Sequence, residues 1–316
     1  MALRNSLFAV SGKASFLDAR RDMSGLFVCD NTTMMPIAGI LDRSQDNLVT
    51  GNGNSMAVTV HPFNAVLNRY GALLIQNDGN VNVPLGAAPS ANSRIDTVYV
   101  KQNETRSPMS DTSDVPTFGV VQGTAAAVPV APEVPTGAVE LAQVLLPAGV
   151  SNTAASGVVI TQTYIGAAMK GDMLRVWTSA QRDALTTVPE GTLLHNAADN
   201  CDYVRKGDKW RGWNMPWRDI HLDNNSANVW ASNGTAHIHV QTADINLTGW
   251  GSYVTVAHVN NSAFYPDTQQ GIQACTANGY FPTFLGVYSD GNVKIGYAGG
   301  QVGKRSVLSV LTYDIG

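Results

Sequence analysis

Apolar and polar residues alternate along most of the chain, and this period of two is typical of half-buried β-strands. Residues 94–100 read RIDTVYV and are rich in β-branched side chains. Comparable runs lie at 118–122 and 138–146. The polar run 103–114 has too little apolar content to pack, so it predicts a surface loop.

Turn residues separate the other β-rich runs. The pair Asp78-Gly79 lies between two such runs, and Asp290-Gly291 lies between two more near the C-terminus. Asp-Gly favours a hairpin because glycine tolerates the positive φ that the turn needs. Pro129, Pro132 and Pro135 instead favour an extended connector. We predict two hairpins and a mostly β chain whose first domain, residues 1–165, is a small β-sandwich or split barrel.

Residues 166–213 predict a small α/β-hairpin module. Gly166–Met169 is a run of small residues that we interpret as a flexible joint. Thr178 or Ser179 can cap a short helix, and a hairpin is expected around Lys206-Gly207-Asp208. A unit of this size buries little by itself, so its tryptophans would need neighbouring copies or domains.

The last part of the chain, residues 214–316, predicts a C-terminal β-sandwich, jelly-roll-like in its number of strands. Asn214–Trp217 is interpreted as a neck that precedes it. The alternating runs beyond the neck are NVWAS, AHIHVQT, SYVTVAHV, GIQAC, FLGVYS, NVKIGYAGG and SVLSVLTYDI.

Composition narrows the classes of protein. The chain has 316 residues, of which 44% are apolar and only 14% are charged, against about a quarter in average proteins. With so few charges, the surface of the protein must be solvated by Ser, Thr, Asn and Gly, a composition that suits β-rich, loop-rich viral structural proteins. A net charge of −4 without a cluster of Lys and Arg argues against a nucleic-acid partner. No apolar segment is long enough to span a membrane or to form the core of a signal peptide, so we expect the chain to have neither.

The N-terminal half resembles the baseplate-anchoring domain of tail proteins from long-tailed bacteriophages, of the minor tail, upper baseplate or receptor-binding type. The pieces that carry the resemblance are Arg94-Ile95-Asp96, Val121-Gln122-Gly123-Thr124, Val130-Ala131-Pro132 and Pro147-Ala148-Gly149. It covers roughly residues 40–165. The family usually continues to Ile-Thr-Asp-x-Arg, whereas residues 160–164 read ITQTY.

The middle segment is similar to a short module of phage tail and fibre proteins. Matching positions are Ser179, Arg182, Asp183, Ala184, Leu185, Pro189, Glu190, Gly191, Thr192, Asn196, Tyr203, Gly207 and Trp210. This resemblance implies a spacer that is commonly held on a three-fold axis. The end of the chain resembles, more loosely, the heads of phage receptor-binding proteins.

Together these resemblances imply a structural virion protein of a phage tail tip or baseplate, assembled in the host cytoplasm. As a homotrimer it would dock on other tail or baseplate proteins through its N-terminal domain and bind host cell-surface polysaccharide through its C-terminal domain. Two alternatives stay open: a tail-associated polysaccharide depolymerase, and a purely structural baseplate subunit that contacts another tail protein.

Candidate catalytic groups are few. Residues 214–316 contain six aspartates and no glutamate, and the chain has no Gly-x-Ser-x-Gly motif. We therefore expect neither enzymatic activity nor a cofactor. His237 and His239 are two apart on a predicted strand, so they share one face and are weak candidates for a metal site together with His258. The same spacing also suits a solvent-exposed face or a trimer axis.

Aromatic residues near predicted loops are better candidates for ligand contacts, because exposed rings stack on the C–H faces of sugars. The predicted binding residues are Trp230, Trp250, Phe264, Tyr265, Asp267 and Gln269, and Tyr253, Tyr280 and Phe281 lie in similar surroundings. For any single ring, packing in the core is the alternative. The loop Asn260–Gly271 is the favoured ligand-contacting segment.

Overall fold

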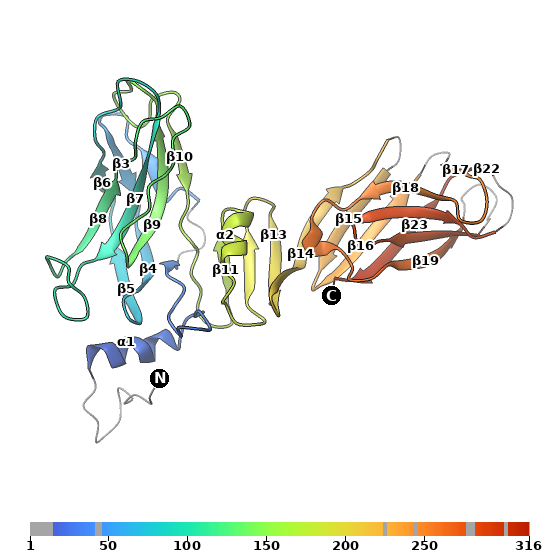
Figure 1. Ribbon diagram of the computed structural model, residues 1–316, viewed down its shortest axis with the longest axis horizontal. Coiled ribbons are helices and arrows are strands. Elements are labelled where there is room, and N and C mark those ends of the chain that lie inside the picture. The colour runs from blue at the N-terminus through green and yellow to red at the C-terminus, as the bar shows by residue number, and fades with distance from the viewer. Residues whose placement is uncertain are drawn as a thin grey trace, which may run out of the picture. The chain divides into compact units, whose positions relative to one another are not determined.

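A computed structural model describes residues 15–41, 46–223, 226–242, 245–275, 282–299 and 303–315 (Figure 1). Strands make up 48% of the chain and helices 6%, which confirms the mostly β prediction, and no sheet within the described ranges closes into a barrel. The chain divides into two compact units, Met1–Thr192 and Leu193–Gly316, and each is described by itself. The boundary lies inside the predicted 166–213 module, and the three-domain division stays a prediction.

The first unit is built on three antiparallel sheets. Their strand orders are β1-β4-β5, β2-β3-β6 and β10-β9-β7-β8. The elements are α1 (Phe16–Ser24), β1 (Gly39–Ile40), β2 (Val49–Gly51), β3 (Ala57–Val60), β4 (Phe63–Asn68), β5 (Ala72–Asn77), β6 (Val81–Pro84), β7 (Arg94–Gln102), β8 (Pro116–Val121), β9 (Ala138–Leu146), β10 (Val159–Gln162), β11 (Met173–Val176) and α2 (Ser179–Ala184). The strands predicted at 94–100, 118–122 and 138–146 are therefore confirmed.

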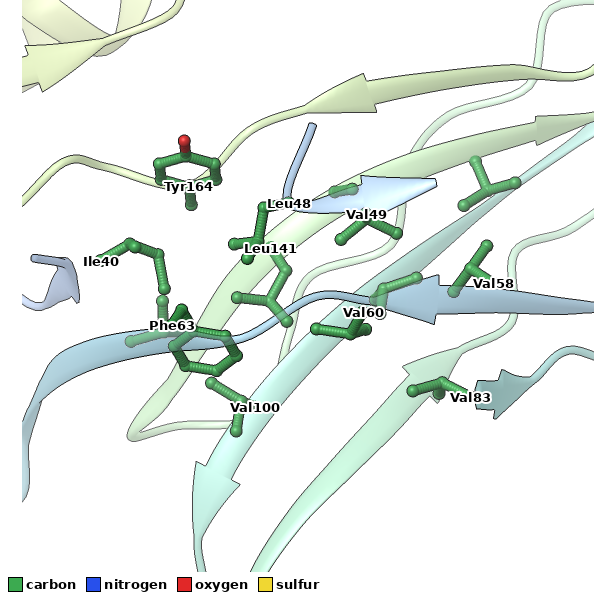
Figure 2. Close-up of a cluster of buried hydrophobic side chains, with 14 of the residues drawn as sticks. Ile40, Leu48, Val49, Val58, Val60, Phe63, Val83, Val100, Leu141 and Tyr164 are labelled. Carbon is green, nitrogen blue, oxygen red and sulfur yellow. The ribbon is translucent and has the colours of Figure 1, made fainter. Parts of the chain in front are cut away.

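One hydrophobic cluster joins these three sheets (Figure 2). Ile40 and Phe63 come from the first sheet, Val58 and Val60 from the second, and Leu141 from the third. Alternation explains the arrangement, because every second residue of these strands points to the same side. The cluster forms the apolar interior between the three sheets of this unit.

A buried ion pair connects two pieces of the motif pattern. The Arg94 Nε lies 2.9 Å from the Asp96 carboxylate, and the Arg94 guanidinium also donates to the carbonyls of Gly86 and Ala87. Asp96 in turn accepts a hydrogen bond from the backbone N–H of Gly123 at 3.0 Å. A buried charge must be paired and hydrogen-bonded, and these contacts link the Arg-Ile-Asp strand to the Gly-Thr turn.

Two local expectations in this unit are wrong. Asp78-Gly79 does not form a hairpin, because it joins β5 and β6, which belong to different sheets. Strand β5 pairs instead with β4 through a turn in which Tyr70 and Gly71 have positive φ. The run Gly166–Met169 is no loose joint either, since Ala167 and Ala168 are buried and the N–H of Gly166 donates to the Arg175 carbonyl. The predicted helix cap is confirmed, with Thr178 as N-cap of α2.

The second unit contains two main sheets. Sheet A has the order β12-β13-β14-β15-β16-β23, sheet B has the order β18-β21-β20-β19, and β17 pairs with β22. The elements are β12 (Leu193–Asn196), β13 (Cys201–Lys206), β14 (Lys209–Asp219), β15 (Ser226–Ser232), β16 (Thr235–Gln241), β17 (Ile245–Leu247), β18 (Tyr253–His258), η1 (Ser262–Phe264), β19 (Gln270–Cys275), β20 (Pro282–Val287), β21 (Asn292–Tyr297), β22 (Gly303–Arg305) and β23 (Leu308–Asp314).

Both predicted hairpins of this unit are confirmed. Lys206 pairs with Lys209 around a two-residue turn, and Gly207 has φ 54°. Strands β20 and β21 are joined through Gly291, which has φ 81°. In each case glycine adopts the left-handed backbone that the turn requires.

The predicted neck is wrong, because Asn214–Trp217 lies inside the continuous strand β14. The first half of β14 pairs with β13, and its second half pairs with β15. The register shifts between Met215 and Arg218, where Pro216 cannot donate a backbone hydrogen bond to the ladder. The segment is therefore an irregularity within sheet A, and it directs Trp217 outward.

Sheets A and B meet through β23, which contacts β19 and β20. Alternate residues are buried in both sheets, among them Val229, Ile238 and Leu311 in sheet A and Leu285 and Ile295 in sheet B. Since the period is two, the residues between them point outward. The unit thus has one outward face on each sheet.

Candidate functional site

A hollow of about 650 Å³ lies on the outward face of sheet A. It is lined by Met215, Pro216, Trp217, Trp230, His239 and Val310, which come from β14, β15, β16 and β23. We call this hollow the tryptophan groove. It brings together two residues that the sequence predicted, Trp230 and His239.

Strand register places these side chains in rows. Trp230 pairs with His237, which pairs with Thr312 on β23. The next row holds His239 and Val310. Alternation buries the residues between the rows and leaves the rows themselves on the outside. The groove is therefore a direct product of the period-two pattern on three adjacent strands.

The ring of Trp230 is held in place by its neighbour. It stacks on the imidazole of His237 at 5.2 Å between centroids and an interplanar angle of 21°. The Nδ1 atom of His237 is 3.0 Å from the hydroxyl of Thr312, so the imidazole is fixed as well. Trp217 is 61% exposed. The groove thus combines one positioned indole with one that is open to solvent.

The chemistry of the lining favours an uncharged ligand. None of the six lining residues is an acid, a lysine or an arginine. Indole faces suit the C–H faces of a pyranose, and the imidazole of His239 can exchange hydrogen bonds with hydroxyl groups. Such a division between aromatic walls and a few polar groups is common in small-ligand sites.

The histidine pair shares one face, as its spacing predicted. His239 lines the groove, while the ring of His237 stacks on that of Trp230. Within the described ranges, no group of three or more His, Cys, Asp or Glu residues is placed to hold a metal ion. His258 lies elsewhere, with its ring against Tyr265 and within hydrogen-bond distance of Asn260. The pair therefore offers two imidazoles for hydrogen bonding.

The predicted ligand residue Phe264 is wrong. Its side chain is 0% exposed, and its ring packs edge-on against Tyr203 and directly over Gly212. The backbone carbonyl of Phe264 also accepts a hydrogen bond from the Tyr313 hydroxyl at 2.9 Å. A ring in this position supports the interior and cannot reach a ligand. Phe264 was predicted to be exposed because its sequence neighbours are polar.

The other predicted residues of the loop Asn260–Gly271 stay near the surface but do not form one site. Tyr265 is half-buried over Gly291, and burial together with the nearby Asp290 raises its pKa. Asp267 forms an ion pair with Arg211, and Gln269 is exposed. None of these three residues lines the tryptophan groove, although Arg211, the partner of Asp267, lies on β14 as three of the lining residues do.

Trp250 is also separate from the groove. It is 83% exposed and meets Tyr297 edge-to-face at 5.8 Å. Tyr253 begins β18 on sheet B and is exposed as well. Tyr280 and Phe281 lie outside the described residues. Exposed aromatic rings therefore occur on both sheets of the second unit.

A scan of protein-family models and a search of the curated proteins found no match for this chain. The described residues include no helix long and apolar enough to cross a membrane. Four lining residues were not among the predicted site residues: Met215, Pro216, Trp217 and Val310. The alternation of Trp213, Met215 and Trp217 is the signal that indicates a strand at the predicted neck.

Proposed function

We propose that this chain is a structural virion protein of a bacteriophage tail tip or baseplate, a homotrimeric receptor-binding protein that attaches to a host cell-surface glycan. In this proposal the first unit contains the anchoring β-sandwich, residues 166–213 act as a spacer, and sheet B together with the part of sheet A that follows residue 213 forms the layers of a jelly-roll-like head. The motif resemblance supports the tail assignment.

The observation that carries the glycan assignment is the pair of indoles in the tryptophan groove. Trp230 is held by His237 and Trp217 is open to solvent, so a neutral pyranose can stack on one ring and be covered by the other. A single shallow site of this kind binds weakly. Three copies on one trimer raise the affinity through effective concentration, which suits attachment to a repeating surface polymer.

A purely structural baseplate subunit is the second candidate, favoured by one specific observation. Val310 and Leu308 are 49% and 56% exposed on the same face of sheet A as Trp217. Exposed apolar side chains that are neighbours often mark a contact with another protein. In that case the groove would receive a side chain of a second tail protein and no sugar.

The test uses the full chain, because a fragment that starts at residue 214 would cut β14. Wild type, Trp217→Ala and Trp230→Ala are compared for binding to bacterial cells and to extracted wall polysaccharides, and Trp250→Ala serves as the matched exposed-tryptophan control. We expect saturable binding that falls in both groove variants and persists in the control.

Sedimentation and mass spectrometry complete the test. A trimer that binds polysaccharide and leaves its chain length unchanged agrees with the proposal. Shortened polysaccharide would establish a depolymerase instead. A folded trimer that binds no polysaccharide, yet captures another tail protein through Trp217, would favour the structural subunit.

A further inference from the structure

The outward face of sheet B carries a second group of aromatic residues. Tyr253 on β18 and Phe284 on β20 both pair with Gly296, which lies on the strand between them. Lys294, two residues before Gly296, pairs with Thr255 on one side and Gly286 on the other. We call Tyr253, Phe284, Tyr288 and Lys294 the tyrosine platform.

Glycines beneath the rings make this face flat. A Cβ atom on Gly296 would lie 2.6 Å from the ring of Tyr253, and one on Gly286 would lie 2.5 Å from the ring of Phe284. The ring of Phe284 also covers the position of a Cβ on Gly271. The ring of Tyr253 therefore lies against the backbone of the neighbouring strand β21, and that of Phe284 lies against its own strand and the neighbouring strand β19. Tyr253 is nonetheless 54% exposed, so its outer surface is free for stacking.

Covering glycines is in itself a stabilising device in sheets, but it does not account for the cation among the rings. The ammonium of Lys294 lies 4.4 Å from the centroid of the Tyr288 ring, where a cation–π contact holds it. Lys294 is diagonal to Tyr253 and Phe284 in the register, a separation of about 7–8 Å between strands. The positive charge is thus held over the Tyr288 ring, on a residue that is diagonal in the register to both Tyr253 and Phe284.

No carboxylate of the described residues forms an ion pair with Lys294. The nearest acidic influence is Asp290, whose pKa is lowered chiefly by hydrogen bonds from the backbone and side chain of Asn292, and to a smaller extent by Lys294. The Asp290 carboxylate is therefore engaged in its own turn. The ammonium keeps a charge that a ligand can neutralise.

We propose that the tyrosine platform binds an acidic glycan, in which a pyranose stacks on Tyr253 and Phe284 and its anionic substituent contacts Lys294. Charge complementarity selects this ligand class, since the one charged side chain among the platform's residues is a cation. The proposal concerns a different sheet and a different ligand from the tryptophan groove, so either can fail without the other.

The experiment is a saturation-transfer NMR titration of the full chain carrying Trp217→Ala, which disables the groove. Two matched pairs of probes are used: oligogalacturonate against its methyl ester, and glucose 6-phosphate against glucose. The acidic member of at least one pair should bind more tightly than its neutral partner. The pair that shows the preference distinguishes a carboxylate from a phosphate. Raised salt should weaken only the acidic member.

Variants test the role of the lysine. Lys294→Met should weaken binding of the acidic probe about two- to fivefold, the range for exposed charge pairs, and should leave the neutral probe unchanged. Asp290→Asn keeps an acceptor for the turn and removes a negative charge, so it should strengthen acidic binding by about a factor of two. Opposite signs from these two variants are specific to an anionic ligand.

A final variant separates binding from stability. Tyr253→Leu keeps an apolar side chain above Gly296 and removes the aromatic face, so it should lower affinity while the unfolding midpoint changes little. Equal affinity for both members of each probe pair, or no binding of any probe by the folded protein, would overturn the proposal. So would a Tyr253→Leu variant that loses stability and retains full affinity.

Discussion

The two outward faces of the second unit use aromatic rings in different ways. On sheet A, the indole of Trp230 stacks on the side chain of His237 from the neighbouring strand and lines a hollow. On sheet B, Tyr253 and Phe284 rest on glycines and lie flat against the backbone. The groove and the platform therefore differ in what their rings pack against, a side chain in one and glycines in the other. The charge differs as well, since the groove lining is neutral and the platform holds Lys294.

The largest effect should come from the residue that supports the interior of this unit. Phe264→Ala removes a fully buried ring over Gly212, and comparable losses cost about 3–5 kcal/mol in the free energy of unfolding. Chemical denaturation of Phe264→Ala and of the milder Phe264→Leu would measure this. Binding at the groove and binding at the platform should weaken together. Loss of binding at one face alone would show that Phe264 does not support both sheets.

Gly286→Ala should affect the platform more than the groove. The new Cβ would lie 2.5 Å from the Phe284 ring, and forcing a group into such a contact costs about 1–3 kcal/mol. Gly79→Ala is the matched control, because a Cβ there would meet nothing within 4 Å. Thermal unfolding compares the two variants. Equal midpoints would show that the ring does not rest on this glycine.

His237 should act as a positioning residue for the groove. His237→Ala removes the surface on which Trp230 stacks, and we expect polysaccharide affinity to fall about two- to tenfold, the range for an aromatic contact of about 0.5–1.5 kcal/mol. His237→Phe should restore most of this affinity because it restores the stack. Binding at the platform is the internal control, and a failure of His237→Phe to rescue would assign the imidazole a direct role.

The smallest effect concerns pH. Hydrogen bonds from Asn292 lower the pKa of Asp290 below its ordinary value of 3.8, so this carboxylate stays charged until the pH falls below that value. The phosphate of glucose 6-phosphate loses one of its two charges near about pH 6, so the difference in affinity between wild type and Asp290→Asn should shrink there, persist down to about pH 4 and disappear in stronger acid. A titration of both proteins in parallel measures it. A difference that closes near neutral pH would point to another group.

Periodicity predicted strands well, but local turn signals predicted pairing only in part. Both Asp-Gly pairs sit between β-rich runs, yet Asp290-Gly291 closes a hairpin and Asp78-Gly79 passes from one sheet to another. A turn determines where the chain reverses or bends, whereas the pairing of β3 with β6 depends on residues more than twenty positions apart. Which of two distant strands a given strand pairs with cannot be read from a short window of sequence.

The candidate site shows the same division. Trp230, His237 and His239 share a face because alternation within a strand and register between neighbours are regular. Trp217 was missed because Pro216 interrupts the pattern. Phe264 was misassigned because the space for its ring is provided by Gly212, a residue far away in sequence. A residue assigned to a ligand site from its sequence neighbours is therefore assigned wrongly where a glycine far away in the sequence makes room to bury its side chain.

The continuous strand β14 has a consequence for mechanics. It is hydrogen-bonded to β13 over its first part and to β15 over its second part. In the proposed attachment role, a particle tethered to a cell in flowing liquid would put this chain under tension. Force along Lys209–Asp219 would have to shear several backbone hydrogen bonds at the same moment, whereas a loose tether would first stretch. The unit is thus built to transmit a pull with little extension.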